Sequence, residues 1–347
     1  MSAVLMCEVP RLVSQVRLST GSELTSATEH NRRHVVSMNP KLQETVSRRQ
    51  GWFTRADALA AGYSDHELRR RLRHGQWSRL ARDAFVEHGD WPREQPWDRA
   101  ERVHRLTIAA VADRLGDVVV SHQSAAVLHG LPIWGLDLTR VHVTRSSGRV
   151  RASETLSVHR SPFTPDEITE VDGLPVMTVE RAIVETACRA SYEVAVVLAD
   201  AALRDRLTTS DRLAATADRY RHWSGSPAAR AAVRFADGLS ESVGESRLRV
   251  LMDNHHLPKP QLQVEIRGHD GRLIGRVDFL LSGLLVVEFD GALKYGGSSE
   301  RIVAEKWRED RLRERGYLVS RVSWPDLDQP QTTASRLLRQ LPACLPT

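Results

Sequence analysis

Cysteine is scarce in this chain of 347 residues. Its three cysteines, Cys7, Cys188 and Cys344, lie far apart and show no paired spacing. This argues against a disulfide framework and a cysteine zinc site, and it fits a reducing compartment. No apolar run approaches the roughly 18 residues that cross a membrane, and the first residues lack the pattern of a secretion signal. We therefore expect a cytoplasmic protein without a membrane partner.

Neither composition nor charge is extreme. Charged residues at 27% and hydrophobic residues at 41% are typical of a globular protein, and the length allows two or three domains. The net charge of +5 is compatible with nucleic acid, but only the distribution of basic residues can locate such a surface.

The patterning divides the chain into four regions and predicts an α+β multidomain fold. Residues 1–38 are polar and aperiodic, so we expect disorder there, and Met38 is a candidate start of translation. Residues 39–90 have the pattern of three short helices and a hairpin. Residues 91–237 form a mixed α/β middle region in which helices dominate. Helices are expected at 98–114, 123–129, 179–189, 192–206, 211–222 and 227–237, and strands at 141–144 and 156–159. Residues 238–347 have the pattern of a helix, a strand, a hairpin, a helix, a strand and a final helix.

The small first domain carries clear helix and strand signals. Ser64-Asp-His-Glu67 matches a capping box, and the helix that it opens ends at Gly75. Trp77–Leu80 and Ala84–Glu87 then have the pattern of two short strands around a turn. Helices followed by a hairpin predict a winged helix-turn-helix.

Basic residues concentrate in this domain. Six arginines and no acidic residue lie between Leu68 and Arg82: Arg69, Arg70, Arg71, Arg73, Arg79 and Arg82. A helix-turn-helix presents its recognition helix to the major groove, and the arginine fork suits both phosphate and guanine edges. We therefore predict that these six arginines bind DNA. A solvated basic face on an ordinary helix is the alternative.

Three segments resemble the N-terminal winged helix of AbiEi-type abortive-infection antitoxins. They are Gly51-Trp-Phe-Thr-Arg-Ala-Asp-Ala-Leu-Ala-Ala-Gly-Tyr-Ser64, Leu68-Arg-Arg-Arg-Leu-Arg-His-Gly-Gln-Trp77 and Arg82-Asp-Ala-Phe-Val86. The resemblance implies DNA binding, often at the protein's own promoter. It also makes a cognate toxin a candidate partner without identifying one.

The middle region offers weaker functional signals. Val120-Ser-His-Gln-Ser-Ala-Ala-Val-Leu-His-Gly130 is similar to the segment that follows this domain in related actinobacterial proteins. Its two histidines, His122 and His129, share roughly one helix face, but no third ligand is near in sequence. Capping and packing explain them. We expect this region to link the other two, and it is a candidate for homodimer formation.

Three acidic residues interrupt an apolar hairpin near the C-terminus. Asp278 lies on its first strand, and Glu288 and Asp290 lie on its second. A buried ionised carboxylate is costly unless it is paired or binds a metal, so the pattern indicates a divalent-cation site. The alternative is an edge hairpin whose carboxylates reach solvent or pair with Arg276 and Lys294.

The same region resembles the PD-(D/E)xK nucleases, and most closely the very-short-patch-repair (Vsr)-like endonuclease domains. The matching features are the early Glu245, the strand with Gln263, Val277-Asp278, Glu288-Phe-Asp-Gly291, Trp307-Arg-Glu-Asp310 and Gly316-Tyr-Leu-Val319. The resemblance implies a restriction-endonuclease-like α/β core with Mg²⁺ or Mn²⁺ held by Asp278, Glu288 and Asp290.

The resemblance also assigns roles to other residues. Glu245 would complete the site, Gln263 would orient water or phosphate, and Lys294 would be the catalytic cation. One departure concerns Asp290, which stands where the family's lysine usually follows the glutamate by two residues.

Strand geometry tests this interpretation. A two-residue turn at Ser282-Gly283 would place Asp278 and Glu288 on opposite faces, whereas a three-residue loop at 282–284 would pair them directly. We therefore predict a loop of odd length or a bulge at Gly283.

Together these patterns predict a DNA-binding protein with a Mg²⁺-dependent endonuclease domain that acts in phage defence or DNA repair. The alternative is an AbiEi-type transcriptional regulator or antitoxin whose nuclease-like domain is catalytically inactive.

Overall fold

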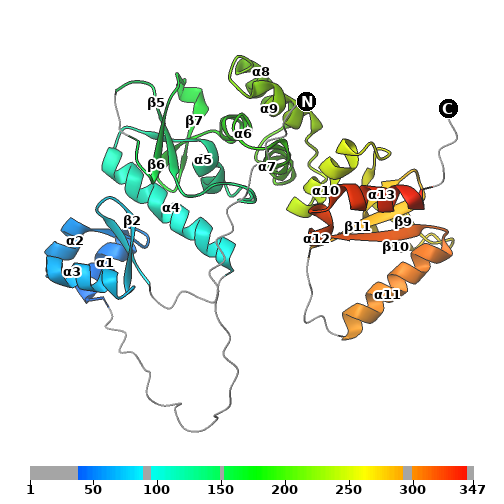
Figure 1. The fold of residues 1–347 in the computed structure, drawn as a ribbon, viewed down its shortest axis with the longest axis horizontal. Helices are drawn as coiled ribbons and strands as arrows, with labels where there is room; N and C mark the ends of the chain where they lie inside the picture. Colours follow the sequence, from blue (N-terminus) through cyan, green and yellow to red (C-terminus); the bar gives the residue numbers. More distant parts are fainter. Residues whose placement is uncertain (1–37, 89–94, 149–151, 292–298, 342–347) are drawn as a thin grey trace, which may run out of the picture.

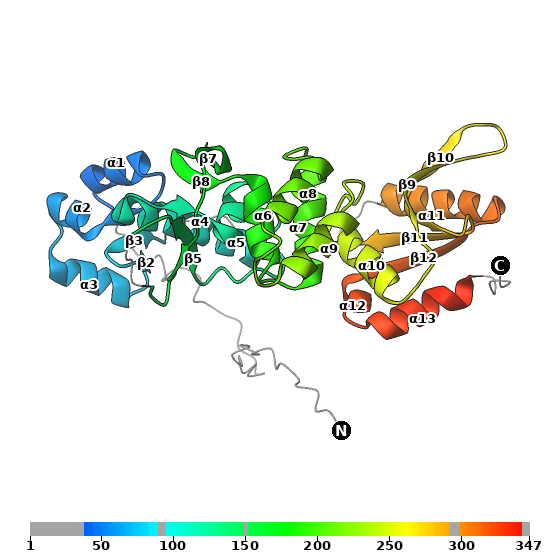
Figure 2. The same cartoon turned by 90° about the horizontal axis from the view of Figure 1, so that it is seen from above.

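Three packed parts follow one another in a row (Figures 1 and 2). The computed structural model describes residues 38–88, 95–148, 152–291 and 299–341. The chain is an α+β protein, as expected, with three separate sheets. The predicted disorder of residues 1–38 falls outside the described residues except at Met38. That side chain is 2% exposed in the first core, so the first domain includes Met38.

The first part has the predicted three helices and hairpin, with a two-residue strand, β1 (Phe53–Thr54), in addition. Its elements are α1 (Pro40–Arg48), β1 (Phe53–Thr54), α2 (Arg55–Ala60), α3 (Asp65–Arg73), β2 (Trp77–Ala81) and β3 (Ala84–Glu87). The strands form an antiparallel sheet in the order β1-β3-β2, and capping boxes at Thr54 and Ser64 open α2 and α3. This is a helix-turn-helix with a β2–β3 hairpin, which we call the wing.

The middle part is a five-stranded sheet covered by helices. Its elements are α4 (Pro96–Leu115), β4 (Val119–Val120), α5 (His122–Leu128), β5 (Val141–Arg145), β6 (Leu156–Arg160), η1 (Pro165–Glu167), β7 (Ile168–Val171), β8 (Leu174–Met177), α6 (Val179–Ala187), α7 (Tyr192–Arg204), α8 (Ser210–Arg219) and α9 (Ser226–Phe235). The strand order is β6-β5-β4-β8-β7. The six helices lie close to their predicted ranges.

Sequence reasoning missed the β7–β8 hairpin, although a signal for it was present. Asp172 and Gly173 form its turn with φ values of 52° and 75°. Asp-Gly supplies the two positive φ angles that a tight hairpin turn requires. Pro175 inside β8 weakened the strand pattern.

The last part has a mixed four-stranded sheet between helices. Its elements are α10 (Val243–Asn254), β9 (Gln261–Arg267), β10 (Leu273–Leu281), β11 (Leu285–Asp290), α11 (Ser299–Glu314), β12 (Leu318–Ser323), α12 (Trp324–Leu327) and α13 (Pro330–Gln340). The order is β12-β11-β10-β9, with β11 and β12 parallel. Leu312 of α11 packs against one face, and residues of α10, α12 and α13 pack against the other. The predicted order of elements is confirmed, with α12 as an additional short helix.

Shared cores join neighbouring parts. Leu80 and Val86 of the wing lie in one cluster with Ile108 of α4. Further along, Val250 of α10 packs with Val196 of α7. Among the described residues, no helix is long and apolar enough to span a membrane.

Candidate nucleic-acid interface and acidic groove

The exposed face of α3 carries a continuous row of basic side chains. His66, Arg69, Arg70 and Arg73 are all exposed and follow the i, i+3, i+4, i+7 spacing of one helix face. We call these four residues the basic stripe. Leu68 on the opposite side packs into the domain core with Phe53 and Trp77. The helix therefore buries one face and presents its cations on the other.

Arg71 does not belong to this surface, and its predicted role in DNA binding is wrong. The residue is 4% exposed, and its guanidinium lies over the Tyr63 and Trp77 rings, 5.1 and 5.0 Å from their centroids. Its position three residues after Leu68 turns it toward the core. Arg71 is a packed residue held by cation–π contacts.

The wing contributes two of the predicted cations. Arg79 on β2 and Arg82 in the turn are both exposed, and Arg82 lies 3.8 Å from Asp83. The Arg79 guanidinium lies 5.7 Å from the Phe85 ring centroid. Five of the six predicted arginines are thus accessible, on α3 and the wing.

The hairpin register brings the two central carboxylates together. Phe279 pairs with Val287 and Leu281 with Leu285, which leaves a three-residue loop at 282–284. Asp278 therefore stands opposite Glu288 on the same face, and the predicted odd-length loop is confirmed. Ser282 and Gly283 have φ values of 50° and 67°.

The neighbouring strand adds a third polar residue to this row. Val277 pairs with Val264 and Phe279 with Leu262, so Gln263 of β9 stands opposite Asp278. Gln263 Nε2 donates to Glu245 Oε2 at 2.9 Å, which joins the start of α10 to β9. The backbone φ of Gln263 is 52°. Residues other than glycine that are held in this left-handed backbone region are often found at functional sites. The structure thus brings Gln263, Asp278 and Glu288 together on adjacent strands, with Glu245 of α10 bonded to Gln263.

Burial perturbs both central carboxylates. It raises the pKa of Asp278, and nearby Glu245 and Glu241 add to this rise although the Phe289 backbone N–H donates to Asp278 Oδ2 at 2.9 Å. Burial likewise raises the pKa of Glu288 against the opposing charge of Arg308. A bound cation would favour the ionised form of such carboxyl groups.

Arg308 of α11 is the cation that sequence reasoning missed. Its Nη2 donates to both oxygens of Glu288 at 2.6 and 2.8 Å, and also to Glu305 Oε1 at 2.9 Å. A carboxylate offers about four lone-pair sites, so a metal ion at Glu288 would share this side chain with Arg308. The predicted catalytic cation, Lys294, lies outside the described residues.

These side chains line an open groove of about 950 Å³ between the sheet and α11. Asp290 is exposed at its edge. The groove mixes both charges, and its lining residues are Arg276, Asp278, Glu288, Phe289, Asp290, Ala304, Glu305, Lys306, Arg308, Glu309, Asp310, Arg313 and Arg321. The predicted metal ligands Asp278, Glu288 and Asp290 and several basic side chains therefore line one accessible groove.

The two histidines singled out in the middle region do not act together. His129 caps the end of α5, and its Nε2 lies 2.8 Å from the Met177 carbonyl. His122 instead meets His142 and His159, which arrive from β5 and β6. The two histidines that join His122 are brought there by tertiary pairing and not by local sequence.

Comparison with known proteins locates one family match and two relatives. The family described as "Transcriptional regulator, AbiEi antitoxin" matches residues 40–86, which cover the helix-turn-helix and most of the wing. Two uncharacterized proteins from two strains of Mycobacterium tuberculosis are each 29% identical over 228 residues, or 65% of this chain and 82% of theirs. The first part of the chain thus carries an AbiEi-like domain.

Proposed function

We propose that this protein is a DNA-binding transcriptional regulator that contacts duplex DNA with α3 and the wing. The observation that carries the proposal is the basic stripe, because it lies on the exposed face of α3, the capped second helix of the helix-turn-helix. The AbiEi description of the matching family supports the same function. That family is described as antitoxins, so a cognate toxin is a proposed partner.

Binding of the full chain to the DNA upstream of its own gene tests this proposal. Fluorescence anisotropy over a salt series would compare wild type with Arg70→Ala, Arg73→Ala and the exposed control Arg339→Ala on α13. Loss of a base contact should cost about 1–3 kcal/mol, and loss of a phosphate contact should reduce the salt slope by about 1. If both stripe variants bind like wild type, the interface lies elsewhere.

A second function is favoured by a specific observation: the three-residue loop aligns Asp278 with Glu288 in the groove. We propose that these carboxylates, with Asp290 and Glu245 beside them, hold Mg²⁺ or Mn²⁺ for phosphodiester hydrolysis in phage defence or DNA repair. The metal would polarise the phosphate when bound. Gln263 would position water or phosphate, Lys294 stays a predicted cation, and Arg308 is the described cation nearest to Glu288.

Cleavage of supercoiled plasmid and of labelled single- and double-stranded DNA, with Mg²⁺, Mn²⁺ or EDTA, tests this second function. The matched variants are Asp278→Ala and Glu288→Ala, with Glu265→Ala on β9 as an acidic control that bonds Arg267 rather than lining the groove. Metal-dependent nicking lost in the first two variants alone would support a nuclease. DNA binding without cleavage under every condition would support the regulator alone. The groove would then have only a structural role.

A further inference from the structure

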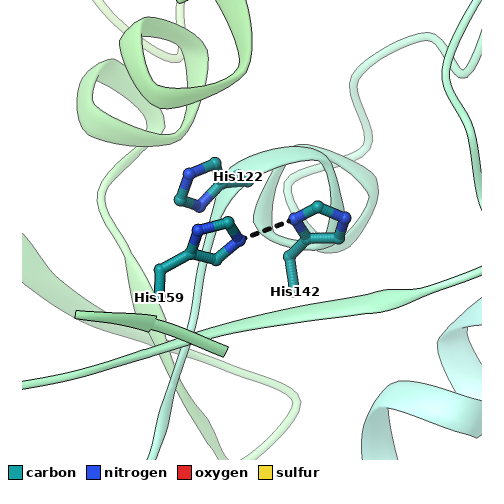
Figure 3. A group of neighbouring side chains, drawn as sticks. All are labelled: His122, His142 and His159. Carbon is teal, nitrogen blue, oxygen red and sulfur yellow. Dashed lines mark hydrogen bonds between the residues drawn. The ribbon is translucent and has the colours of Figure 1, made fainter. Parts of the chain in front are cut away.

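Three histidines from three elements meet on one side of the middle sheet (Figure 3). His122 begins α5, His142 lies on β5 and His159 lies on β6. His142 Nδ1 and His159 Nε2 are 2.9 Å apart, and the His122 ring stacks on the His159 ring with centroids 3.7 Å apart. One nitrogen from each ring lies within 4.8 Å of the other two. Imidazole nitrogens thus converge from segments up to 37 residues apart (159 − 122).

A buried carboxylate orients the first of these rings. Glu185 Oε2 lies 3.3 Å from His122 Nδ1 and accepts from the His122 backbone N–H at 3.1 Å, while Glu185 Oε1 binds Arg181. Histidines that bind metals usually donate their other ring N–H to a carboxylate or carbonyl, which fixes the tautomer. Nδ1 also lies 3.1 Å from Ser121 Oγ, so contacts with Ser121 and Glu185 engage Nδ1 and leave Nε2 of His122 as a ligand atom.

The cluster is largely withdrawn from solvent. Burial, with nearby cationic groups adding to it, lowers the pKa of His122 to about 2 and those of His142 and His159 to about 4. His122 is buried, whereas His159 is partly exposed on β6, an edge strand, which gives an ion a path inward.

We propose that His122, His142 and His159 form a binding site for a divalent transition-metal ion, with Zn²⁺ as the best match. Imidazole suits Zn²⁺, Co²⁺, Ni²⁺ and Cu²⁺, and three protein ligands leave a fourth position open. The site is separate from the carboxylate groove and lies in the part of the chain that the AbiEi match does not cover.

Binding requires a small rearrangement of the rings. Zn–N bonds of about 2.0–2.1 Å in a tetrahedron place ligand nitrogens about 3.3 Å apart, a little more than the 2.9 Å between His142 and His159. The stacked His122 and His159 rings must also turn so that both lone pairs point at the ion. Rotation about the Cβ–Cγ bond is soft, so the backbone can stay in place.

Titration of the chelator-treated full chain with Zn²⁺ and with Co²⁺ tests the proposal. We expect one Zn²⁺ per chain at this site by calorimetry, a visible ligand-field spectrum of tetrahedral Co²⁺, and a Tm that rises with Zn²⁺ concentration. His159→Gln and His142→Asn should each weaken binding by more than about 100-fold, because loss of an outer partner alone can cost about 100-fold.

Two controls separate this site from others. His129→Gln removes a histidine at the opposite end of α5 that bonds the Met177 carbonyl, and Asp278→Ala with Glu288→Ala removes the groove carboxylates. Both controls should keep the Co²⁺ spectrum. Far-ultraviolet circular dichroism would verify that each variant is folded. Wild-type affinity retained in His159→Gln and His142→Asn, or no Co²⁺ spectrum in wild type, would overturn the proposal and leave a packed, uncharged histidine cluster.

Discussion

At the scale of single residues, identical side chains in one motif have opposite environments. Arg70 is exposed and Arg71 is 4% exposed, although they are adjacent. The difference was present in the sequence, because Arg71 follows Leu68 by three positions and precedes Leu72 by one, which places it on the apolar face. The count of arginines predicted the interface, but helical spacing was needed to decide which arginines belong to it.

Substitution of these two neighbours should separate stability from binding. Arg71→Ala removes a buried cation stacked on Tyr63 and Trp77 and should lower the free energy of unfolding by about 2 kcal/mol. Arg70→Ala, on the exposed face, should change it by less than about 0.5 kcal/mol. Urea denaturation measures both. Equal effects of the two substitutions would contradict the packing role of Arg71.

His104 predicts a pH dependence of stability. Its Nδ1 lies 3.0 Å from the Leu138 carbonyl, so Nδ1 is the donor and Nε2 accepts from Ser124 Oγ at 3.0 Å. Burial lowers the pKa of His104 from 6.5 to about 4. Between these values the unfolded chain binds more protons, so the free energy of unfolding falls as pH falls from 6.5 to about 4.

The expected contribution of His104 over this window is about 3 kcal/mol, from about 1.36 kcal/mol per pKa unit. His104→Asn keeps a donor toward the Leu138 carbonyl but cannot titrate. Denaturation of the metal-free protein at several pH values should therefore give a shallower pH slope in the variant than in wild type. Parallel slopes would show that His104 does not titrate differently in the folded chain.

The histidine cluster marks what single-residue reasoning could not find. His142 and His159 are 17 residues apart (159 − 142), and their rings meet only because β5 pairs with β6 in parallel. In that register Thr144 stands opposite His159, so His142 and His159 share one face of the sheet. The sequence predicted both strands, but it carried no signal for their pairing.

At the scale of elements, the apolar alternation of the C-terminal hairpin determined its loop. Only an odd loop places Leu281, Leu285 and Val287 in one core and Asp278 with Glu288 on the other face. A slip by one residue would exchange these faces. This is why the loop length and the row of carboxylates were predictable, whereas the position of Arg308 on a separate helix was not.

Deletion of Gly283 should therefore damage the last domain far more than a substitution in the same loop. A two-residue turn would force the slip and turn a carboxylate strand position toward the core against α10 and α13, so we expect a lower Tm and loss of a single cooperative transition. Ser282→Gly keeps the loop length and relieves a φ of 50°, and it should be neutral or slightly stabilising. Calorimetry of both variants measures these changes in Tm. An unchanged Tm after the deletion would contradict the register argument.

At the scale of the whole molecule, polar contacts couple the middle and last parts. Arg249 of α10 donates from Nη2 to both oxygens of Asp200 of α7 at 2.7 and 2.8 Å, and from Nη1 to the Phe235 carbonyl. Asp200 is 1% exposed and Arg249 is 6% exposed. Helix ranges were readable from the periodicity, but this contact depends on how two separately patterned domains meet.

Asp200→Ala should loosen this junction, because it leaves the Arg249 cation buried without its carboxylate. Breaking a buried pair in this way costs about 3–5 kcal/mol. The control Asp218→Ala breaks the exposed pair with Arg230 and should cost less than about 1 kcal/mol. The double variant Asp200→Leu/Arg249→Met should recover most of the loss, since an apolar contact replaces the stranded charge.

Calorimetry of the full chain distinguishes coupling from local packing. If the ion pair holds the two parts together, Asp200→Ala should split the unfolding of the chain into separate transitions, and the double variant should bring them back together. A shift of Tm with an unchanged number of transitions would instead assign the pair to local packing of α7 and α10. If the proposed groove cleaves DNA that the proposed interface holds, this junction has to be rigid. The Asp200 variant should therefore also alter any cleavage pattern while leaving promoter affinity at the basic stripe unchanged.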